Sequence, residues 1–404
     1  MFLNYAGKDY SIIDKRQYKS EIYLLLVTLV SFTGLGLIIC TVVNSRIVLL
    51  TVLTIIPQCL IASFQALNQA WERFTEYSII NVLPKLLLTI SIVVLFFWGH
   101  ASGNTISVSY SLIVWGISWF FLIRFWKDTR GEKASKVFSK TNVNTTWNGL
   151  LITAGNYINI LFHSIDKQFV LTLYSKESFA LYTFAMSLQN IMMIFVNSLA
   201  NPFYPRLAKE DIKREQLERI KELLLAFGIY AGCAFFVVSF IVSKFIQKYS
   251  GSLMICAVFF AVFPASAIIN VLYINLYKIR KKLKKYIFTL IGMLVIAALA
   301  NLIVVLINGG YTGIALATML CYYIWLLYSQ IDFDDIRISR KDLFFLAGFM
   351  IMYFMAVNLF QNPIVGFLVY IVVASIWNVF FYKDSIMYLI NHFAKLNQNN
   401  GVKP

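Results

Sequence analysis

The pattern of apolar and polar positions divides the chain into long apolar segments joined by short polar connections. A membrane-spanning helix needs roughly 20 mainly apolar residues to cross about 30 Å of hydrocarbon. Twelve segments have this character, at 21–43, 47–67, 78–98, 105–126, 147–170, 179–201, 223–246, 252–277, 286–307, 311–330, 343–360 and 364–381. The pattern therefore predicts an all-α, polytopic membrane helix bundle of about 12 transmembrane helices.

The basic residues fall almost entirely in alternate connections. Of the 35 Lys and Arg, 29 lie in or beside the N-terminal segment, the C-terminal tail and every second connection, whereas Lys85 lies within a span. Lys and Arg are retained on the cytoplasmic side of a membrane, so both termini are expected to be cytoplasmic. This bias, with attraction to anionic lipid, explains the formal net charge of +16 without a nucleic-acid partner. A composition of 59% apolar and 13% charged residues also excludes a soluble domain.

No catalytic constellation is evident in the sequence. The histidines His100, His163 and His392 are scattered, and no GxSxG, HExxH or P-loop pattern occurs. The acidic group at 332–335 lies beside basic residues, and we interpret it as a solvated charge cluster rather than a metal site. The five cysteines lie within predicted spans, where they are expected to act as small apolar residues. We therefore expect no enzyme activity, no cofactor and no metal site.

Two neighbouring predicted helices carry polar stripes. On a wheel of 100° per residue, the helix at 147–170 places six polar residues within about 140°: Thr153, Asn156, Asn159, His163, Asp166 and Lys167. The helix at 179–201 has a similar row: Ser187, Asn190, Asn197 and Asn201. A central Asp or Lys facing lipid costs about 2.5–3.5 kcal/mol, so both stripes should face the interior of the bundle. A hydrated cavity is the expected reason for them, and hydrogen bonding between helices is the alternative.

Lys85 is a second buried-charge candidate. It follows Pro84 and lies about seven residues, roughly 10 Å, from the cytoplasmic end of its helix. Its side chain either lines a cavity or snorkels back to the interface, and both interpretations stay open.

The chain also contains an internal repeat. Residues 72–97 can be aligned with residues 281–306, which pairs Tyr77 with Tyr286. Parallel repeats related by an axis along the membrane normal are typical of transporters.

A family resemblance rests on three stretches of the chain. They are IDKQFVLTLYSKESFALYTFAMSL (165–188), NPFYPRLAKE (201–210) and QALNQAWERFTEYSIINVLPKLLL (65–88). The first two resemble the seventh and eighth helices of Wzx-type flippases, where an Asp and a basic residue precede an apolar stretch, an aromatic segment and a Pro-containing exit. The third resembles the turn between the fourth and fifth helices. Wzx flippases belong to the MOP superfamily, with the multidrug MATE exporters.

This resemblance implies a MOP/MATE-like architecture of two six-helix lobes with two extra helices. The expected divisions are an incomplete four-helix lobe at 1–126, a cytoplasmic linker at 127–146, a six-helix lobe at 147–330, the extra pair at 343–381 and a cytoplasmic tail at 382–404 with an amphipathic helix. Both the repeat and the resemblance thus predict that the first two helices are missing. A misassigned start, a split gene and a shortened protein are the open explanations.

The resemblance also implies a function. Wzx-type proteins move an undecaprenyl-diphosphate-linked oligosaccharide across the bacterial inner membrane by alternating access, for O-antigen, lipopolysaccharide or capsule biosynthesis. The implied partners are this polyprenyl-diphosphate-linked glycan, membrane lipid, a polysaccharide polymerase and other assembly proteins. A MATE-like multidrug exporter, an integral-membrane polysaccharide polymerase and a non-transporting scaffold of an assembly complex are the alternatives.

Candidate roles follow from this resemblance. Lys85 and Lys167 are expected to hold the diphosphate, and His163 to line the cavity. Four asparagines are expected to contact sugar: Asn156, Asn159, Asn190 and Asn197. Asp166 either pairs with Lys167, which we expect, or couples transport to a proton or sodium gradient.

Overall fold

The computed structural model is helical throughout the part that it describes, with no strand there. The described residues are 15–43, 46–100, 102–131, 133, 140–209 and 214–400. They divide into two compact units, one formed by residues 1–150 and 204–210 and the other by residues 151–203 and 211–404. Each unit is treated by itself below.

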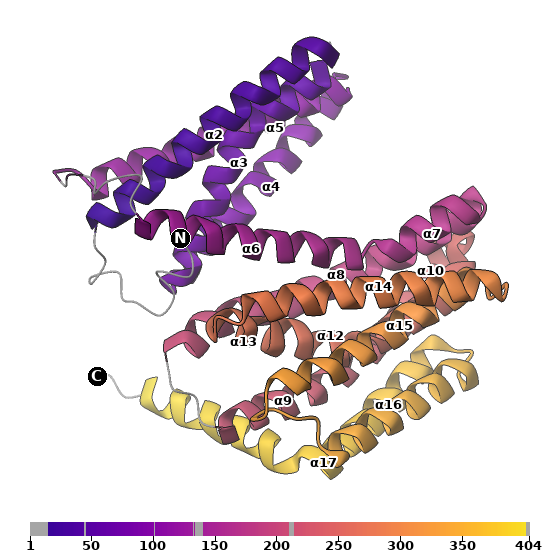
Figure 1. Cartoon of the computed structure of the whole chain (residues 1–404). Coiled ribbons are helices and arrows are strands. Elements are labelled where there is room, and N and C mark those ends of the chain that lie inside the picture. Colours follow the sequence, from indigo (N-terminus) through magenta and orange to yellow (C-terminus); the bar gives the residue numbers. More distant parts are fainter. Residues whose placement is uncertain are drawn as a thin grey trace. The chain divides into compact units, whose positions relative to one another are not determined.

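Most of unit 1 is a bundle of helices (Figure 1). They are α2 (Lys15–Val43), α3 (Arg46–Ala70), α4 (Phe74–Phe97) and α5 (Gly103–Asp128). Its aromatic core lies where α2 begins and α5 ends. The Tyr18 ring packs in T-shaped geometry with the rings of Trp71 and Phe125, and the centroid distances are 5.5 and 5.1 Å. Within the unit α4 buries only Ile80, so the apolar surface of this helix remains available to lipid or to other parts of the protein.

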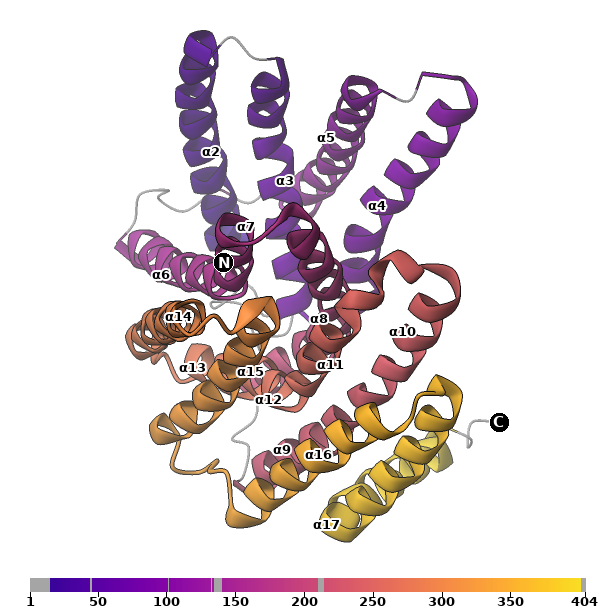
Figure 2. The same cartoon turned by 90° about the vertical axis from the view of Figure 1, so that its right-hand side faces the viewer.

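Unit 2 contains the remaining helices, which Figure 2 shows from a second side. They are α6 (Lys140–Phe162, which begins in unit 1), α7 (Ile165–Leu173), α8 (Lys176–Lys209), α9 (Arg214–Ile229), α10 (Ala231–Phe245), η2 (Gln247–Ser252), α11 (Leu253–Ala261), α12 (Phe263–Ile268), the π-helix η3 (Ile269–Tyr273), α13 (Ile274–Ile279), α14 (Leu283–Leu306), α15 (Gly310–Ser329), η4 (Gln330–Asp332), α16 (Arg340–Leu359) and α17 (Pro363–Asn400). The backbone is helical to Asn400 at the C-terminal end of α17. Non-helical backbone at Tyr382 separates this end from the apolar part of α17.

The twelve predicted spans lie in helical segments, but 47–67 and 147–170 are not among the candidate spans found in the described residues. Among the described residues, nine helices are long and apolar enough to cross a membrane. The pair Gln247–Ala261 and Phe263–Ile279, which meet at 43°, raises the number to ten if it is counted as one broken span rather than a re-entrant loop. Pro264 lies just after this bend, and a proline inside a helix removes a backbone hydrogen bond. These helices indicate a multi-pass membrane protein.

The predicted helix at 147–170 is broken between α6 and α7. At the break, the Ser164 hydroxyl donates to the carbonyl of Ile160 (2.8 Å), and the Ser164 amide donates to Leu161, three residues back (3.0 Å). Bonds of this kind tighten and bend a helix. The break therefore has a local chemical cause, and it lies two residues before Asp166.

The internal repeat extends to the backbone. The helices α4 and α14 begin and end at aligned positions, and the aligned residues Glu72 and Lys281 both precede them with positive φ (57° and 55°). The aligned residues that follow, Gly99 and Asn308, also have positive φ (71° and 55°). A residue in the left-handed backbone region stands at both ends of both helices. Two unrelated segments would rarely share this pattern.

The basic connections of unit 2 meet at one end of its helices, as the alternating charge pattern requires. A buried ion pair joins α9 to α16 there: Lys221 Nζ lies 2.6 Å from Asp342 Oδ2, and their side chains are 5% and 1% exposed. The Tyr382 hydroxyl at the bend of α17 donates to Asp342 Oδ1 (2.7 Å). Lys221 also donates to the carbonyl of Arg337 (2.7 Å). One buried carboxylate thus fixes three helices.

The acidic group at 332–335 belongs to the same basic end. Asp332 pairs with Lys285 (2.9 Å), and Asp335 pairs with Arg280. The Arg280 guanidinium holds the pKa of Asp335 below its ordinary value, against a smaller opposing effect of burial. These carboxylates thus connect helices through ion pairs.

Breaking the buried pair should destabilise unit 2 far more than breaking an exposed one. We expect Lys221→Met to cost about 3–5 kcal/mol, because Asp342 would stay buried without a cation. Lys341→Met is the matched control: Lys341 is 46% exposed and lies 3.3 Å from Glu222, so its loss should cost at most about 1 kcal/mol. Thermal unfolding of both purified variants in detergent compares them, and equal midpoints would contradict the assignment.

Candidate functional site

The most unusual polar group of unit 2 is the carboxylate of Asp166 at the start of α7, which is 2% exposed. Its Oδ2 accepts from the Tyr182 hydroxyl of α8 (2.7 Å) and from the Thr318 hydroxyl of α15 (3.2 Å). Its Oδ1 accepts from the backbone N–H of Lys167 (2.7 Å). The carboxylate therefore joins three helices through hydrogen bonds alone.

A second hydrogen bond lies beside the first. The Tyr322 hydroxyl, one helical turn after Thr318 on α15, is 2.5 Å from Nδ1 of His163. Phe162 closes this side, with ring centroids 5.3 Å from Tyr322 and 5.0 Å from Trp325. We call Asp166, Tyr182, Thr318, His163 and Tyr322 the Asp166 cluster.

The depth of the Asp166 cluster can be read from the helix ends. Asp166 lies about 12 Å, at 1.5 Å per residue, before the turn at Tyr174 that leads to α8. Thr318 lies about the same distance after Gly310, where α15 begins. The rings of Tyr174 and Tyr311 are in contact, with centroids 6.2 Å apart, so these two turns share one end of the unit. With these two turns at the surface of a hydrocarbon layer about 30 Å thick, the cluster would lie near the middle of the layer.

The expected salt bridge between Asp166 and Lys167 does not form. Successive helical residues point about 100° apart, so the two side chains diverge. The Lys167 ammonium instead lies over the ring of Phe179, 5.7 Å from its centroid. Among the described residues, no cation lies within salt-bridge distance of the Asp166 carboxylate.

The polar stripe of α6 and α7 passes from surface to interior. Asn156 is exposed, Asn159 and His163 are half-buried, and Asp166 is buried. The Asn159 Oδ1 is buried and has no hydrogen-bond partner among the described residues. On α8, Asn190 and Asn197 are exposed, whereas the side chain of Asn201 lies outside the described residues. The structure thus brings His163 and Asp166 together and leaves the three exposed asparagines on the surface of unit 2.

Lys85 is separate from these residues, because it belongs to α4 of unit 1. Its side chain is exposed, and the neighbouring Leu83, Leu86 and Leu87 are exposed as well. Pro84 does not break the helix, which continues from Phe74 to Phe97.

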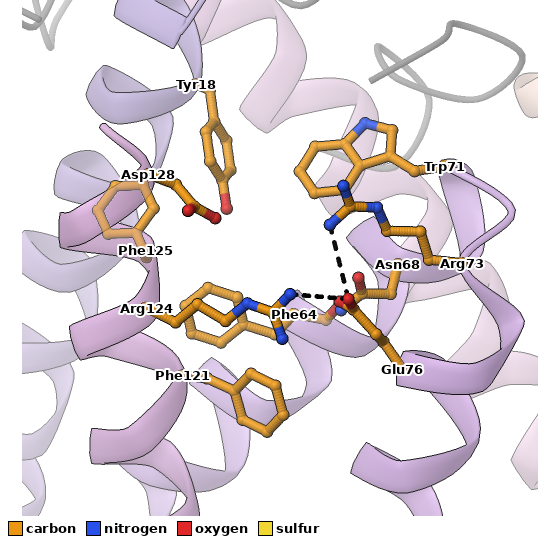
Figure 3. A pocket seen from close by; sticks show the side chains of 10 residues that line it. All are labelled: Tyr18, Phe64, Asn68, Trp71, Arg73, Glu76, Phe121, Arg124, Phe125 and Asp128. Atoms are coloured by element: carbon orange, nitrogen blue, oxygen red, sulfur yellow. Dashed lines mark hydrogen bonds and ion pairs between the residues drawn. The ribbon is translucent and has the colours of Figure 1, made fainter. Parts of the chain in front are cut away.

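A small pocket lies at the basic end of unit 1 (Figure 3). The guanidinium groups of Arg73 and Arg124 converge on Glu76, at 3.7 and 2.8 Å. Aromatic rings and polar groups form the rest of the wall: Tyr18, Phe64, Asn68, Trp71, Phe121, Phe125 and Asp128. Its volume of about 30 Å³ has room for about two water molecules.

An ion pair in unit 2 also begins at a position of the repeat. Glu76 aligns with Lys285, and Lys285 pairs with Asp332 of η4 (2.9 Å) as Glu76 pairs with Arg124 of α5 (2.8 Å). Arg124 and Asp332 themselves lie outside the aligned stretches. The repeat therefore covers α4, α14 and their turns, and the two ion pairs are similar in place but exchanged in charge.

Sequence reasoning missed the side-chain partners of Asp166 and His163. Tyr182, Thr318 and Tyr322 were not singled out, although Thr318 and Tyr322 stand four residues apart on one face of an apolar helix. That spacing was the available signal. Within the described residues, no three His, Cys, Asp or Glu side chains gather closely enough to hold a metal ion.

Comparison with known proteins leaves the family of the chain open. No family model, curated protein or solved structure matches it.

The exposed asparagines should contact water if their stripe lines a hydrated cavity. In a background with the native cysteines replaced by alanine, we expect Asn156→Cys, Asn190→Cys and Asn197→Cys to react with a membrane-impermeant maleimide, because the reagent needs a thiolate in water. Leu161→Cys and Phe195→Cys are the controls: both are exposed but lie about 140° around their helices.

Labelling of the three asparagine positions above the two controls supports the cavity. Equal protection of all five positions from the maleimide would contradict the hydrated cavity.

Proposed function

We propose that this protein translocates a polyprenyl-diphosphate-linked oligosaccharide from the inner to the outer leaflet of the bacterial plasma membrane. The observation that carries the proposal is the repeat of α4 and α14, with its matching turns. Parallel repeats are a common basis of alternating access, because each half supplies one side of a path. In this proposal the basic ends of the helices face the cytoplasm.

The polar surface of unit 2 supports transport of a polar group. Exposed Asn156, Asn190 and Asn197 would be unfavourable against lipid, but amide groups donate and accept the hydrogen bonds that sugar hydroxyls require. The stripe continues inward to the Asp166 cluster. A row of amides leading to a buried carboxylate suits a path for a hydrated substrate better than a lipid-facing surface.

The cations within the spans support an anionic substrate. Lys85 and Lys167 lie in or beside apolar helices, and neither lies within salt-bridge distance of a described carboxylate. A diphosphate carries the charge that such ammonium groups attract. The substrate's lipid tail would stay in the bilayer, where no polar contact is needed.

The two lysines test the substrate. In a host that depends on this protein for surface glycan, we expect Lys85→Ala and Lys167→Ala each to reduce export about tenfold or more, because a hydrogen bond to a charged group contributes about 1.5–3 kcal/mol. Lys244→Ala is the matched control. Lys244 is exposed and lies in the last turn of α10, away from the basic connections. Surface glycan and the lipid-linked intermediate are measured together, at equal amounts of membrane-inserted protein.

An export defect with accumulated lipid-linked glycan agrees with the proposal. Full export by both lysine variants would refute the diphosphate assignment. A complete chain that supports no export at all, with the glycan still made, would refute the function.

A further inference from the structure

We infer that Asp166 takes up and releases a proton, and that this reaction is the step at which a proton gradient drives the cycle. The second part rests on the proposed function. The first part concerns the Asp166 cluster alone and holds whatever the protein carries.

The charge environment separates Asp166 from every other buried or half-buried carboxylate described in unit 2. The others each have a Lys or Arg partner, in the pairs Asp342–Lys221, Asp335–Arg280, Asp332–Lys285, Glu222–Lys341 and Glu218–Arg214. Asp166 has two hydroxyls and one backbone N–H. Because no described cation neutralises it, uptake of a proton changes the charge of this buried site by one full unit.

The partners of Asp166 suit both of its protonation states. A hydroxyl can donate a hydrogen bond or accept one. When Asp166 is ionised, Tyr182 and Thr318 donate to Oδ2; when Asp166 is protonated, its own O–H can donate to one of these oxygens. The hydrogen bonds therefore survive the reaction, whereas a lysine or arginine partner would lose its counter-charge.

A proton fits this geometry better than a metal cation. The Tyr182 oxygen lies 2.7 Å from Oδ2, which is the spacing of a direct O–H···O hydrogen bond. Hard cations collect six or more oxygen ligands, and carboxylates supply much of their charge. Asp166 brings one carboxylate and is already occupied by three donors. The site has the chemistry of a proton acceptor.

The ionisable groups on the surrounding helices allow a proton to reach Asp166. Those that face or adjoin it are Lys167 on α7, His163 at the end of α6, Tyr182 on α8, and Cys321 and Tyr322 on α15. The helix α14, which packs against α7, has no ionisable residue from 287 to 306. His163 is half-buried and bonded to Tyr322, and the stripe continues from it to exposed Asn156. In this proposal the proton reaches Asp166 along the polar face of α6.

The position of Asp166 explains how its charge could change the structure. It lies two residues after the break between α6 and α7, and one oxygen atom holds both α8 and α15. An anion at this joint favours the entry of water, whereas the neutral acid is compatible with a dry, closed joint. Protonation thus acts where three helices meet beside a hinge.

The test is a pH titration of the purified full chain in lipid, followed by infrared difference spectroscopy. We expect a carbonyl band from a protonated carboxyl that disappears as the pH rises, that is missing in Asp166→Asn, and that persists in Asp166→Glu. Asp335→Asn is the matched control and should keep the band, because Asp335 is paired with Arg280. Asp166→Asn keeps the size of the side chain, so folding is preserved, and this is checked by its melting temperature.

Tyr182→Phe separates a proton site from a structural one. Loss of a hydroxyl that donates to the carboxylate disfavours the anion, so the midpoint of the band should move to higher pH by about one to two units. An unchanged midpoint, a band that survives in Asp166→Asn, or a band that responds to sodium rather than to pH would overturn the inference. The measurement needs no substrate, so its failure and a failure of translocation are independent results.

Discussion

A polar group inside a bilayer has no water to bond, and the rest of this structure depends on that constraint. The backbone satisfies it by forming helices wherever the structure is described. Charged side chains that are buried in the protein meet a similar constraint in two ways. Asp342 is matched by Lys221 and fixes α9, α16 and α17 together, whereas Asp166 is held by neutral donors from α7, α8 and α15. The ion pair holds helices together, and the hydrogen-bonded Asp166 carboxylate keeps a negative charge that protonation can neutralise.

The repeat gives these two arrangements a common framework. The helices α4 and α14 begin and end at aligned positions, and residues with positive φ precede and follow both of them. The backbone geometry of these two helices and their turns, rather than one particular side chain, is what the two units have in common. The Asp166 cluster has a different origin, because it depends on α7 and α8 as well as on α15.

The sequence was sufficient to predict the helices, because span length and apolar content follow directly from the thickness of the bilayer. It also placed His163 and Asp166 on one face, since helical periodicity fixes directions along a single helix. It could not predict what Asp166 meets, because Tyr182 and Thr318 come from helices whose rotation is set by packing. The pairing of Asp166 with Lys167 was wrong for a related reason: neighbours in sequence diverge on a helix. The break at Ser164 was missed because an apolar segment with one serine looks continuous.

The central claim, proton-linked translocation of a lipid-linked glycan, is tested most directly in vesicles containing only the purified protein. A fluorescent polyprenyl-diphosphate oligosaccharide is placed in both leaflets, a pH gradient is imposed, and the fraction accessible to an external quencher is followed over time. The account predicts exchange much faster than in protein-free vesicles, a rate that changes with the gradient, and loss of that response in Asp166→Asn. Exchange no faster than in empty vesicles, or a rate indifferent to the gradient, would contradict it.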